Sequence, residues 1–558
     1  MFSSVRARWV CMLALALFCF SSAVGAKPRS TQWIPANASS ELAQMLKDFS
    51  ELTGIYRKSG SESGVRDFIL NIAFENGIRE YEVDPSGNLK IFVPGTGEFS
   101  SWGRERSIAL QSHMDMVLDL ENETSALAQE GFFKSEGIEL VNDNGWVHSA
   151  NHQTSIGADN GIGVISMIRY LRRTDIPHPP LDLIFTSYEE AGFVGAKGLV
   201  IPSRVRALVN LDGGVYGTAT LGGHGYRRLA MKYALKADRL GVDQQLVKIE
   251  FKGLHGGHSG LNGHDGYANS VNLLARWLVF LSLDSGIRNT GVRVVALDAG
   301  DSAYNKIPNF FAVTLALKSE QAARVQSLLD AFGHQVQTEY ASKENGISWK
   351  IEAPTPPISG VERGVLLSAI ASISDRVAKT PFGVITSEEY PASADLNSNM
   401  SFLHLNPGKD FRSRELTVGI MPRFLVDDIG VRFNDQMRKH FEAVPGFKAS
   451  VFYEESGPAW NPGKESELAR LYSLSLGRVD PTTEMKTEVS LGGLEPGQFA
   501  EKYPHLPMIA LAQANIHDEH SRMESFEIES LEKSVKVLDA YLYDLGASER
   551  SWAFGTDQ

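Results

Sequence analysis

Short apolar runs that alternate with helical patterns constrain the fold of this chain more than any other feature. Residues 107–111, 181–187 and 207–211 form runs of strand length, and apolar residues recur at helical spacing in 161–170 and 192–200. Strands that are apolar on both faces lie in sheets that helices cover on both sides. We therefore predict an α/β fold in which a mixed sheet carries helices on both faces.

The pattern changes near residue 217. Residues 247–251, 292–297 and 311–317 alternate apolar and polar side chains, and long helical patterns at 269–283 and 320–340 are interleaved with them. This arrangement indicates an inserted α+β domain.

A similar series of elements follows residue 365, so we predict that the inserted domain contains two similar halves. A cluster of Gly, Pro and Asn residues at 457–462 marks the return to the first domain. The predicted divisions are a signal segment at 1–26, a first domain in two parts at 27–216 and 456–558, and a lid or dimerisation domain at 217–455.

The first 26 residues are predicted to be a cleavable signal peptide. Arg6 and Arg8 form a basic start, residues 9–20 are apolar, and a run of small residues ends at Ala26. This order is typical of a secretory signal, and the apolar run is shorter than a membrane span. An uncleaved membrane anchor is the alternative. We expect cleavage after Ala26 and a secreted protein, periplasmic if bacterial, without membrane association after cleavage.

Both cysteines, Cys11 and Cys19, lie inside this segment. The processed chain would therefore lack disulfides, thiolate nucleophiles and cysteine metal ligands. Any bound metal must be held by His, Asp and Glu, a donor set that suits zinc or manganese. The net charge of −13 becomes more negative when Arg6 and Arg8 are removed, which disfavours nucleic acid as a partner.

Acidic and histidine residues follow the predicted strands. In open α/β sheets, ligand sites form beyond the carboxyl ends of the strands. Each residue alone has a structural explanation: Asp159 could cap the next helix, and Glu189 and Glu190 could form a solvated strand end. Two adjacent carboxylates repel each other, however, and a bound cation relieves that repulsion. The sequence thus predicts a metal site among His113, Asp115, Asp159, Glu189, Glu190, Asp212 and His520.

Six strings in this sequence resemble motifs of a known family: SHMDMV, IGADNGIGV, TSYEEAGFVGAKGL, NLDGG, FKGLHGGHSG and HSRMESFEIES. They resemble, in order and approximate spacing, the co-catalytic zinc peptidase family of aminoacylases and glutamate carboxypeptidases, and within it the aminoacyl-histidine (Xaa-His) dipeptidases. The resemblance extends with gaps from about residue 45 to 545. It implies a zinc-exopeptidase-like sheet, an inserted lid and two zinc ions per subunit, with manganese or cobalt as alternatives.

The resemblance also implies which residues bind metal. His113 would be the first ligand of one zinc ion, and Asp159 would bridge the two ions next to a cis peptide bond. Glu190 and His520 would complete one zinc site, and Asp212 the other.

Further roles follow from the same resemblance. Glu189 resembles the general base, and Asp115 resembles the carboxylate that orients the first histidine ligand. His258 resembles a lid histidine that polarises the scissile carbonyl, typically from the neighbouring subunit, which implies a homodimer. Asn305 and Arg423 resemble groups that hold the C-terminal end of the substrate. For Arg423, a salt bridge with the aspartate at 427 or 428 is the alternative.

The chain departs from the family pattern at several points. His517 competes with His520 as a ligand, and the spacing from His520 to the last predicted helix favours His520. His255 is likewise an extra histidine beside His258. The two residues after Asp212 are glycines where Xaa-His dipeptidases carry acidic residues, which leaves the preference for histidine open.

Together these features predict metal-dependent hydrolysis of dipeptides or short peptides, with release of free amino acids. An N-acyl-amino-acid amidohydrolase acting at the same two-zinc site is the main alternative. A catalytically silent peptide-binding protein is the other, although every expected metal ligand and Glu189 are present.

Overall fold

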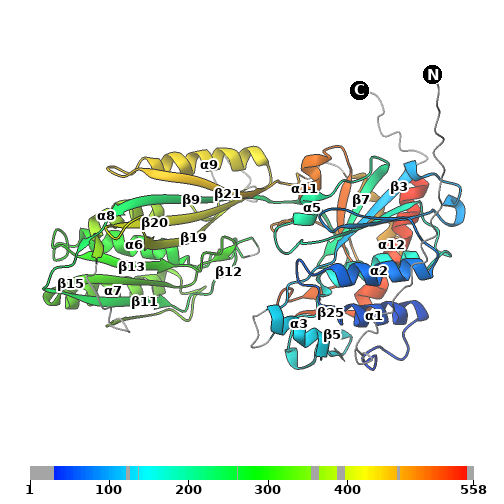
Figure 1. The fold of residues 1–558 in the computed structure, drawn as a ribbon, viewed down its shortest axis with the longest axis horizontal. Coiled ribbons are helices and arrows are strands. Elements are labelled where there is room, and N and C mark those ends of the chain that lie inside the picture. Colours follow the sequence, from blue (N-terminus) through cyan, green and yellow to red (C-terminus); the bar gives the residue numbers. More distant parts are fainter. Residues whose placement is uncertain are drawn as a thin grey trace, which may run out of the picture.

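The computed structural model describes residues 30–120, 126–135, 137–260, 262–353, 363–385, 396–461 and 466–548. The predicted signal segment lies outside these ranges. The described chain forms two domains that lie side by side: an α/β domain built from both ends of the chain and an inserted domain built from its middle (Figure 1).

An eight-stranded mixed sheet forms the centre of the α/β domain. Four neighbouring strands in the middle of this sheet run parallel, so their carboxyl ends share one edge. In order across the sheet, the strands are β1 (Tyr81–Val83), β2 (Leu89–Val93), β6 (Leu181–Thr186), β3 (Ser107–His113), β7 (Val205–Gly213), β23 (Met508–Ala512), β8 (Thr218–Gly223) and β22 (Lys486–Ser490). The parallel strands are β6, β3, β7 and β23.

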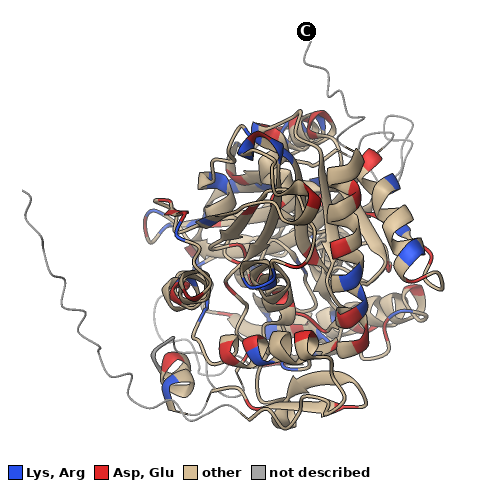
Figure 2. Cartoon of the chain, turned by 90° about the vertical axis from the view of Figure 1, so that its right-hand side faces the viewer, with Lys and Arg blue, Asp and Glu red and all other residues tan. Residues whose placement is uncertain are grey.

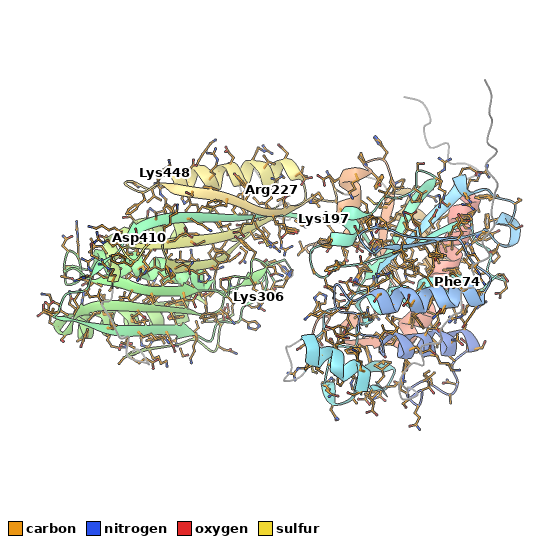
Figure 3. All side chains as sticks on the ribbon, viewed as in Figure 1. Phe74, Lys197, Arg227, Lys306, Asp410 and Lys448 are labelled. Carbon is orange, nitrogen blue, oxygen red and sulfur yellow. The ribbon has the colours of Figure 1, made fainter. Side chains whose placement is uncertain are left out.

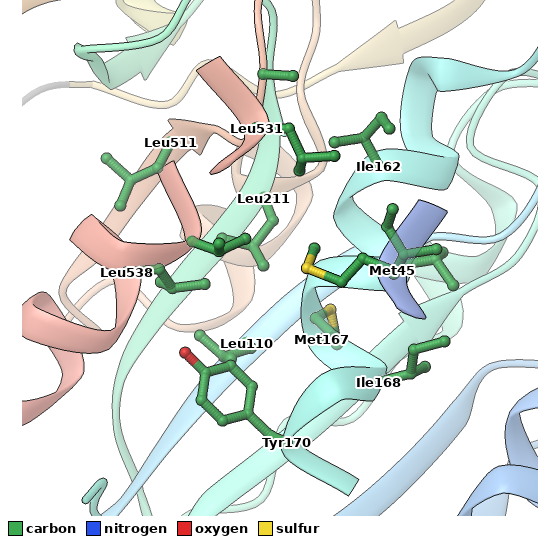
Figure 4. Close-up of a cluster of buried hydrophobic side chains, with 14 of the residues drawn as sticks. Met45, Leu110, Ile162, Met167, Ile168, Tyr170, Leu211, Leu511, Leu531 and Leu538 are labelled. Atoms are coloured by element: carbon green, nitrogen blue, oxygen red, sulfur yellow. The ribbon is translucent and has the colours of Figure 1, made fainter. Parts of the chain in front are cut away.

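Helices cover both faces of this sheet, as predicted. The larger apolar core lies between the sheet and one layer of helices, and it includes Leu110, Ile162 and Leu538 (Figure 4). Ala109 and Leu208 point to the other face, into a smaller core. The first layer contains α1 (Ser40–Leu52), α2 (Ser63–Glu75), α4 (Ala158–Ile168), α10 (Glu467–Val479) and α12 (Ile528–Ser548), and the second contains α5 (Val194–Gly198) and α11 (Glu495–Lys502).

A four-stranded antiparallel sheet extends the α/β domain. It joins two chain segments that are far apart in sequence, and the loop between its two C-terminal strands carries His520. The strands are β4 (Leu140–Asp143), β5 (Trp146–Ser149), β24 (Ile516–His517) and β25 (Ser525–Glu527), and α3 (Ala126–Ser135) precedes them.

The inserted domain is built on one long antiparallel sheet whose two halves meet where β13 pairs with β19, at Asp298↔His404 and Ala299↔Leu403. Each half contributes two long helices to a single apolar core. The first half contains β16 (Ser348–Glu352), β11 (Gln244–Lys252), β15 (Phe311–Lys318), β13 (Arg293–Ala299), α6 (Ser270–Leu283) and α7 (Ser319–Glu339). The second half contains β19 (Leu396–Pro407), β20 (Ser413–Phe424), β9 (Gly225–Lys236), β21 (Ala449–Gly457), α8 (Leu367–Ala378) and α9 (Asp427–Glu442).

The limits of the inserted domain differ from the predicted limits of 217 and 455. Thr218–Gly223 forms β8 of the first sheet, and the chain enters the second sheet only at Gly225. It leaves that sheet at Gly457. The sequence could not show this, because β8 pairs with β22 and β23 from the far end of the chain.

Ionic and hydrogen-bonded contacts join the two domains. Lys197 of α5 lies 3.4 Å from Glu455 of β21, and both Lys197 and Arg227 lie where the domains approach each other (Figure 3). Lys306 lies on the edge of the inserted domain that faces the α/β domain. The inserted domain is therefore held against the rim where the carboxyl ends of the central strands meet.

In the view of Figure 2, acidic and basic residues are interspersed along the described elements. Within the described ranges, no helix has both the length and the apolar character needed to cross a membrane.

Candidate metal centre and active site

The sheet brings the predicted acidic and histidine residues together at one edge. His113 is the last residue of β3, Glu189 and Glu190 follow β6, and Asp212 lies at the end of β7. Asp159 lies at the start of α4, beside these strand ends. These side chains and His520 line one pocket of about 220 Å³.

Asp159 lies between two groups of donor atoms. Its Oδ1 atom is 2.9 Å from Nε2 of His113, which is itself 3.6 Å from Oδ1 of Asp212. Its Oδ2 atom is 3.0 Å from Nε2 of His520, which is 2.9 Å from Oε1 of Glu190. Each carboxylate oxygen of Asp159 therefore belongs to a separate three-residue set, which is the arrangement expected of a bridging ligand. The peptide bond between Asp159 and Asn160 is cis, as predicted.

The donor set fits divalent cations. Glu190 Oε1 is buried and makes no hydrogen bond of acceptable geometry, although it lies close to His520. Burial and the Asp159 carboxylate raise the pKa of Glu190, and burial raises the pKa of Asp212. Two imidazoles and three carboxylates in one cluster are the ligands that zinc takes when cysteine is absent. A ligand atom from each of His113, Asp159 and Glu190 lies within 4.8 Å of the others.

The pKa shifts of the clustered histidines and carboxylates are those expected of a metal site. Burial opposes the charged form of His520, but its hydrogen bond to Asp159 and the adjacent Glu190 carboxylate raise its pKa to about 11. Hydrogen bonds from His113 and His520 lower the pKa of Asp159 against the effect of burial. The carboxylates thus attract positive charge, and a bound divalent ion would supply it in place of the protons.

His517 lies apart from this cluster. It forms part of β24, and its ring stacks on Trp146 with centroids 4.4 Å apart. His520, three residues later, is the histidine in contact with Asp159 and Glu190. The choice of His520 over His517, made on spacing, therefore agrees with the geometry.

Asp115 supports the cluster in a way that the sequence did not predict. Its carboxylate accepts hydrogen bonds from the backbone N–H groups of Glu189 and Glu190 at 3.0 and 3.2 Å, and from Ser59 Oγ at 2.7 Å. Nδ1 of His113 is nearer to the Asp115 carbonyl, at 3.1 Å, than to its carboxylate, at 3.6 Å. Asp115 therefore positions the Glu189–Glu190 segment as well as the His113 ring.

Glu189 lines the pocket beside the ligand set. Its carboxylate makes no hydrogen bond or ion pair with the part of the chain that the structure describes. Burial and the neighbouring Glu190 carboxylate raise its pKa well above the ordinary value. A carboxylate that is near the ligands, free of partners and raised in pKa has the properties of a general base.

Two buried residues that sequence reasoning missed hold the loop that carries Asp159. Arg57 donates to the carbonyl groups of Met114, Asp115 and Gly157. Glu524 accepts from the backbone N–H groups that precede and include Asp159, at 2.8 to 3.1 Å. Glu524 lies in the HSRMESFEIES string, which was a signal for it, whereas Arg57 lies in none of the six strings.

Glu495 is fully buried below the pocket. Its Oε2 atom accepts hydrogen bonds from Gln111 Nε2 at 2.5 Å and Thr186 Oγ1 at 2.8 Å, while Oε1 has no partner among the described residues. Asn210 donates to Gln111 at 2.7 Å, so the contacts of Glu495 reach three strands of the sheet. Glu495 thus anchors the start of α11 beneath the ligand set.

Glu495→Gln is expected to make the stability of the metal-free protein less dependent on pH. Burial raises the pKa of Glu495 from 4.5 to about 8. Because the folded pKa is raised, this carboxyl contributes stability below about pH 4.5 that is lost as the pH rises through about 8, on the order of a few kcal/mol. The free energy of unfolding, measured with denaturant in the presence of chelator across this pH range, should change less steeply with pH in the variant than in the unmodified protein. An equal change with pH in both proteins would contradict the assignment.

The inserted domain places His258 and Arg423 beside the pocket of the same chain. Arg423 Nη2 lies 3.3 Å from Nε2 of His258, and Arg423 Nη1 donates at 3.4 Å to the carbonyl of Leu491, close to the pocket wall. Burial, with the nearby charges of Arg423 and His520, lowers the pKa of His258 to about 4. The homodimer stays a prediction.

Arg423 has no carboxylate partner in the described part of the chain. Its side chain is 4% exposed, and its Nε atom makes no hydrogen bond. Burial lowers its pKa to about 10. The alternative salt bridge is absent among these residues, because Asp427 accepts from the Ala459 N–H group and Asp428 pairs with Arg432.

Asn305 lies beside His258 but outside the ligand pocket. Its carbonyl accepts a hydrogen bond from the N–H group of Ser259 at 2.7 Å, and it lines a separate cavity with His258 and Lys306. The described contacts therefore connect Asn305 to the backbone of the loop that carries His258.

A mixed α/β sheet with a cluster of carboxylates and histidines at its carboxyl edge, next to a glutamate outside the ligand set, is typical of metal-dependent hydrolases. The model of Peptidase family M20/M25/M40 matches residues 109–544, and the chain belongs to this family of metal-dependent peptidases. The resemblance found in the sequence is thereby confirmed.

Individual relatives extend over most of the chain. It is 25% identical over 515 residues to the cytosol non-specific dipeptidase of Escherichia coli (strain K12), a match that covers 91% of this chain and 100% of that protein. The crystal structure of aminoacylhistidine dipeptidase from Vibrio alginolyticus is similar at a TM-score of 0.70 and 25% identity, covering 90% of this chain and 96% of that one. Aminopeptidase PepT from Bacillus cereus has the same fold at a TM-score of 0.55 and 16% identity, covering 90% and 99%.

Proposed function

We propose that this chain is a dipeptidase that binds two zinc ions and releases free amino acids. The observation that carries the proposal is the division of donors around Asp159, with His113 and Asp212 on one side and Glu190 and His520 on the other. The dipeptidase names of two relatives that cover about nine-tenths of the chain support the substrate class.

Separate steps of the proposed reaction are assigned to the metal ions, Glu189 and His258. When bound, the metal ions supply Lewis acidity that polarises the scissile carbonyl and activates water. Glu189 accepts the proton from the attacking water and delivers it to the leaving amine, because its carboxylate is not needed as a ligand. His258 is neutral at physiological pH and can donate a hydrogen bond to the oxygen on which negative charge develops.

Arg423 is proposed to bind the C-terminal carboxylate of the substrate. A buried guanidinium with a free Nε–H group and no acidic partner among the described residues fits a carboxylate ligand. Asn305 contributes to this end of the site through the loop that carries His258.

An N-acyl-amino-acid amidohydrolase would use the same metal ligands and Glu189. Purified protein should cleave unblocked dipeptides, including Xaa-His dipeptides, with a larger kcat/KM than N-acetyl amino acids. Activity should be lost in chelator and return with Zn²⁺, Mn²⁺ or Co²⁺. Faster hydrolysis of the N-acetyl compounds would overturn the dipeptidase proposal, and a protein that binds both substrates without turnover would be a silent homologue.

We further propose that the chain is exported and processed after Ala26. The basic start, the apolar run and the small residues before Lys27 support this proposal. Export would distinguish the chain from its Escherichia coli relative, which is named as a cytosolic protein. N-terminal sequencing of the mature protein should begin at Lys27, and recovery of the intact N-terminus would contradict it.

A further inference from the structure

We propose that Glu519 and Gln513 form the subsite that binds the α-ammonium group of the substrate. The inference rests on the proposed dipeptidase function and names the residues that recognise a free amino terminus. Both residues line the pocket that contains the metal ligands.

These two residues lie beside the glycines that follow the ligand Asp212. Gln513 comes directly after β23, whose last residue pairs with Gly213. Glu519 lies over Gly214, since a Cβ atom built at that glycine would be 2.9 Å from Oε1 of Glu519. The absence of side chains at both glycines leaves this wall of the pocket to Glu519 and Gln513.

Both side chains offer acceptors that the described protein does not use. Gln513 is 3% exposed; its amide nitrogen donates at 3.3 Å to the carbonyl of Ala512, while its Oε1 atom is buried without a hydrogen-bond donor. A buried acceptor without a donor is costly unless a ligand supplies one. Glu519 has no hydrogen-bond or ion-pair partner among the residues that the structure describes, and it is exposed to the pocket. A carboxylate and an amide oxygen together suit an ammonium group, which carries several N–H donors.

The position of this subsite matches the shape of a dipeptide. The α-ammonium group and the scissile carbonyl are separated by one carbon atom, so its subsite must adjoin the metal ligands. Glu519 meets this condition, because it directly precedes His520 in the chain and lies over Gly214, two residues after Asp212. Arg423, the proposed partner of the C-terminal carboxylate, and His258 lie on the inserted domain, apart from Glu519 and Gln513 in the chain. Charged groups at both ends would restrict the site to unblocked dipeptides.

The test compares two substrates that differ only in the amino group, Ala-Ala and N-propionyl-Ala. In the zinc-loaded enzyme, Glu519→Gln should lower kcat/KM for Ala-Ala about 10- to 100-fold. The kcat/KM for N-propionyl-Ala should stay within about twofold of that of the unmodified enzyme. Where turnover of N-propionyl-Ala is too slow to measure, its inhibition constant should stay within the same limit. Gln513→Leu should cause a smaller loss of the same selectivity.

Asp518→Asn is the matched control, because it removes one negative charge from the adjacent exposed position, outside the pocket lining. Its φ of 54° is readily adopted by Asn. This variant should keep kcat/KM for both substrates within about twofold of the unmodified enzyme.

Several outcomes would decide the question. Equal losses on both substrates, or no loss on Ala-Ala, would overturn the ammonium subsite while leaving the dipeptidase proposal intact. An unmodified enzyme that cleaves N-propionyl-Ala but not Ala-Ala would instead overturn the dipeptidase proposal. The metal content of each variant is measured alongside its kinetics. If Glu519→Gln loses metal, the test is the preference of Gln513→Leu for Ala-Ala over N-propionyl-Ala. An unchanged preference in that variant would reject the subsite.

Discussion

Glu189→Gln is expected to lower kcat for dipeptides by about 10²- to 10⁴-fold while leaving the bound metal in place. The carboxylate lies in the pocket beside Glu190 but is not part of either donor set around Asp159. Glutamine keeps the size of the side chain and removes its capacity to accept a proton, and a positioned general base contributes a factor of this size. Steady-state kinetics and elemental analysis of the same preparation measure the two quantities.

Glu190→Gln is the matched control for this prediction. The same change one residue further along the chain removes a carboxylate that lies 2.9 Å from His520 Nε2. This variant should lose metal as well as activity, because an amide is a weaker ligand than a carboxylate. If Glu189→Gln retained activity within about tenfold, or lost metal as Glu190→Gln does, Glu189 would not be the base.

The ligand set could be predicted because its chemistry is local in sequence. Each of His113, Glu190 and Asp212 follows an apolar strand, and parallel strands place such residues at one sheet edge. Asp159 and His520 could not be joined to them by strand order alone. Both were candidates from residue type and position, the resemblance to the family supplied their roles as ligands, and the structure brings both into contact with the others.

The supporting residues could not be predicted, because their roles depend on contacts between distant segments. Arg57 donates hydrogen bonds to the backbone carbonyls of residues 114, 115 and 157. Because these partners are backbone groups, the sequence around Arg57 contains no pattern that predicts the contacts. Glu524 binds backbone N–H groups in the loop before α4. Gln513 and Glu519 line the same pocket as Asp212 because the C-terminal strand β23 lies beside β7. Strand β8 was misassigned to the inserted domain for the same reason.

The loop between β24 and β25 determines which of two nearby histidines lies beside Asp159 and Glu190. A hydrogen bond from the Ser521 N–H group to the Asp518 carbonyl at 3.2 Å closes a turn around His520. The turn directs His520 toward Asp159 and Glu190, whereas His517 stays in β24 and stacks on Trp146. Substitution of the two histidines should therefore have different effects on metal binding.

His520→Ala is expected to reduce metal affinity and kcat/KM by at least about 100-fold, whereas His517→Ala should keep both within a few-fold of the unmodified enzyme. Loss of a residue that only supports a ligand costs about 10- to 100-fold, and loss of a direct ligand costs more. His517→Ala removes the stacking contact with Trp146, so its main effect should be a lower melting temperature. Elemental analysis, chelator competition and dipeptide kinetics on both variants measure these effects. The reverse pattern, with metal lost only in His517→Ala, would place the second metal site elsewhere and would remove His520 from it.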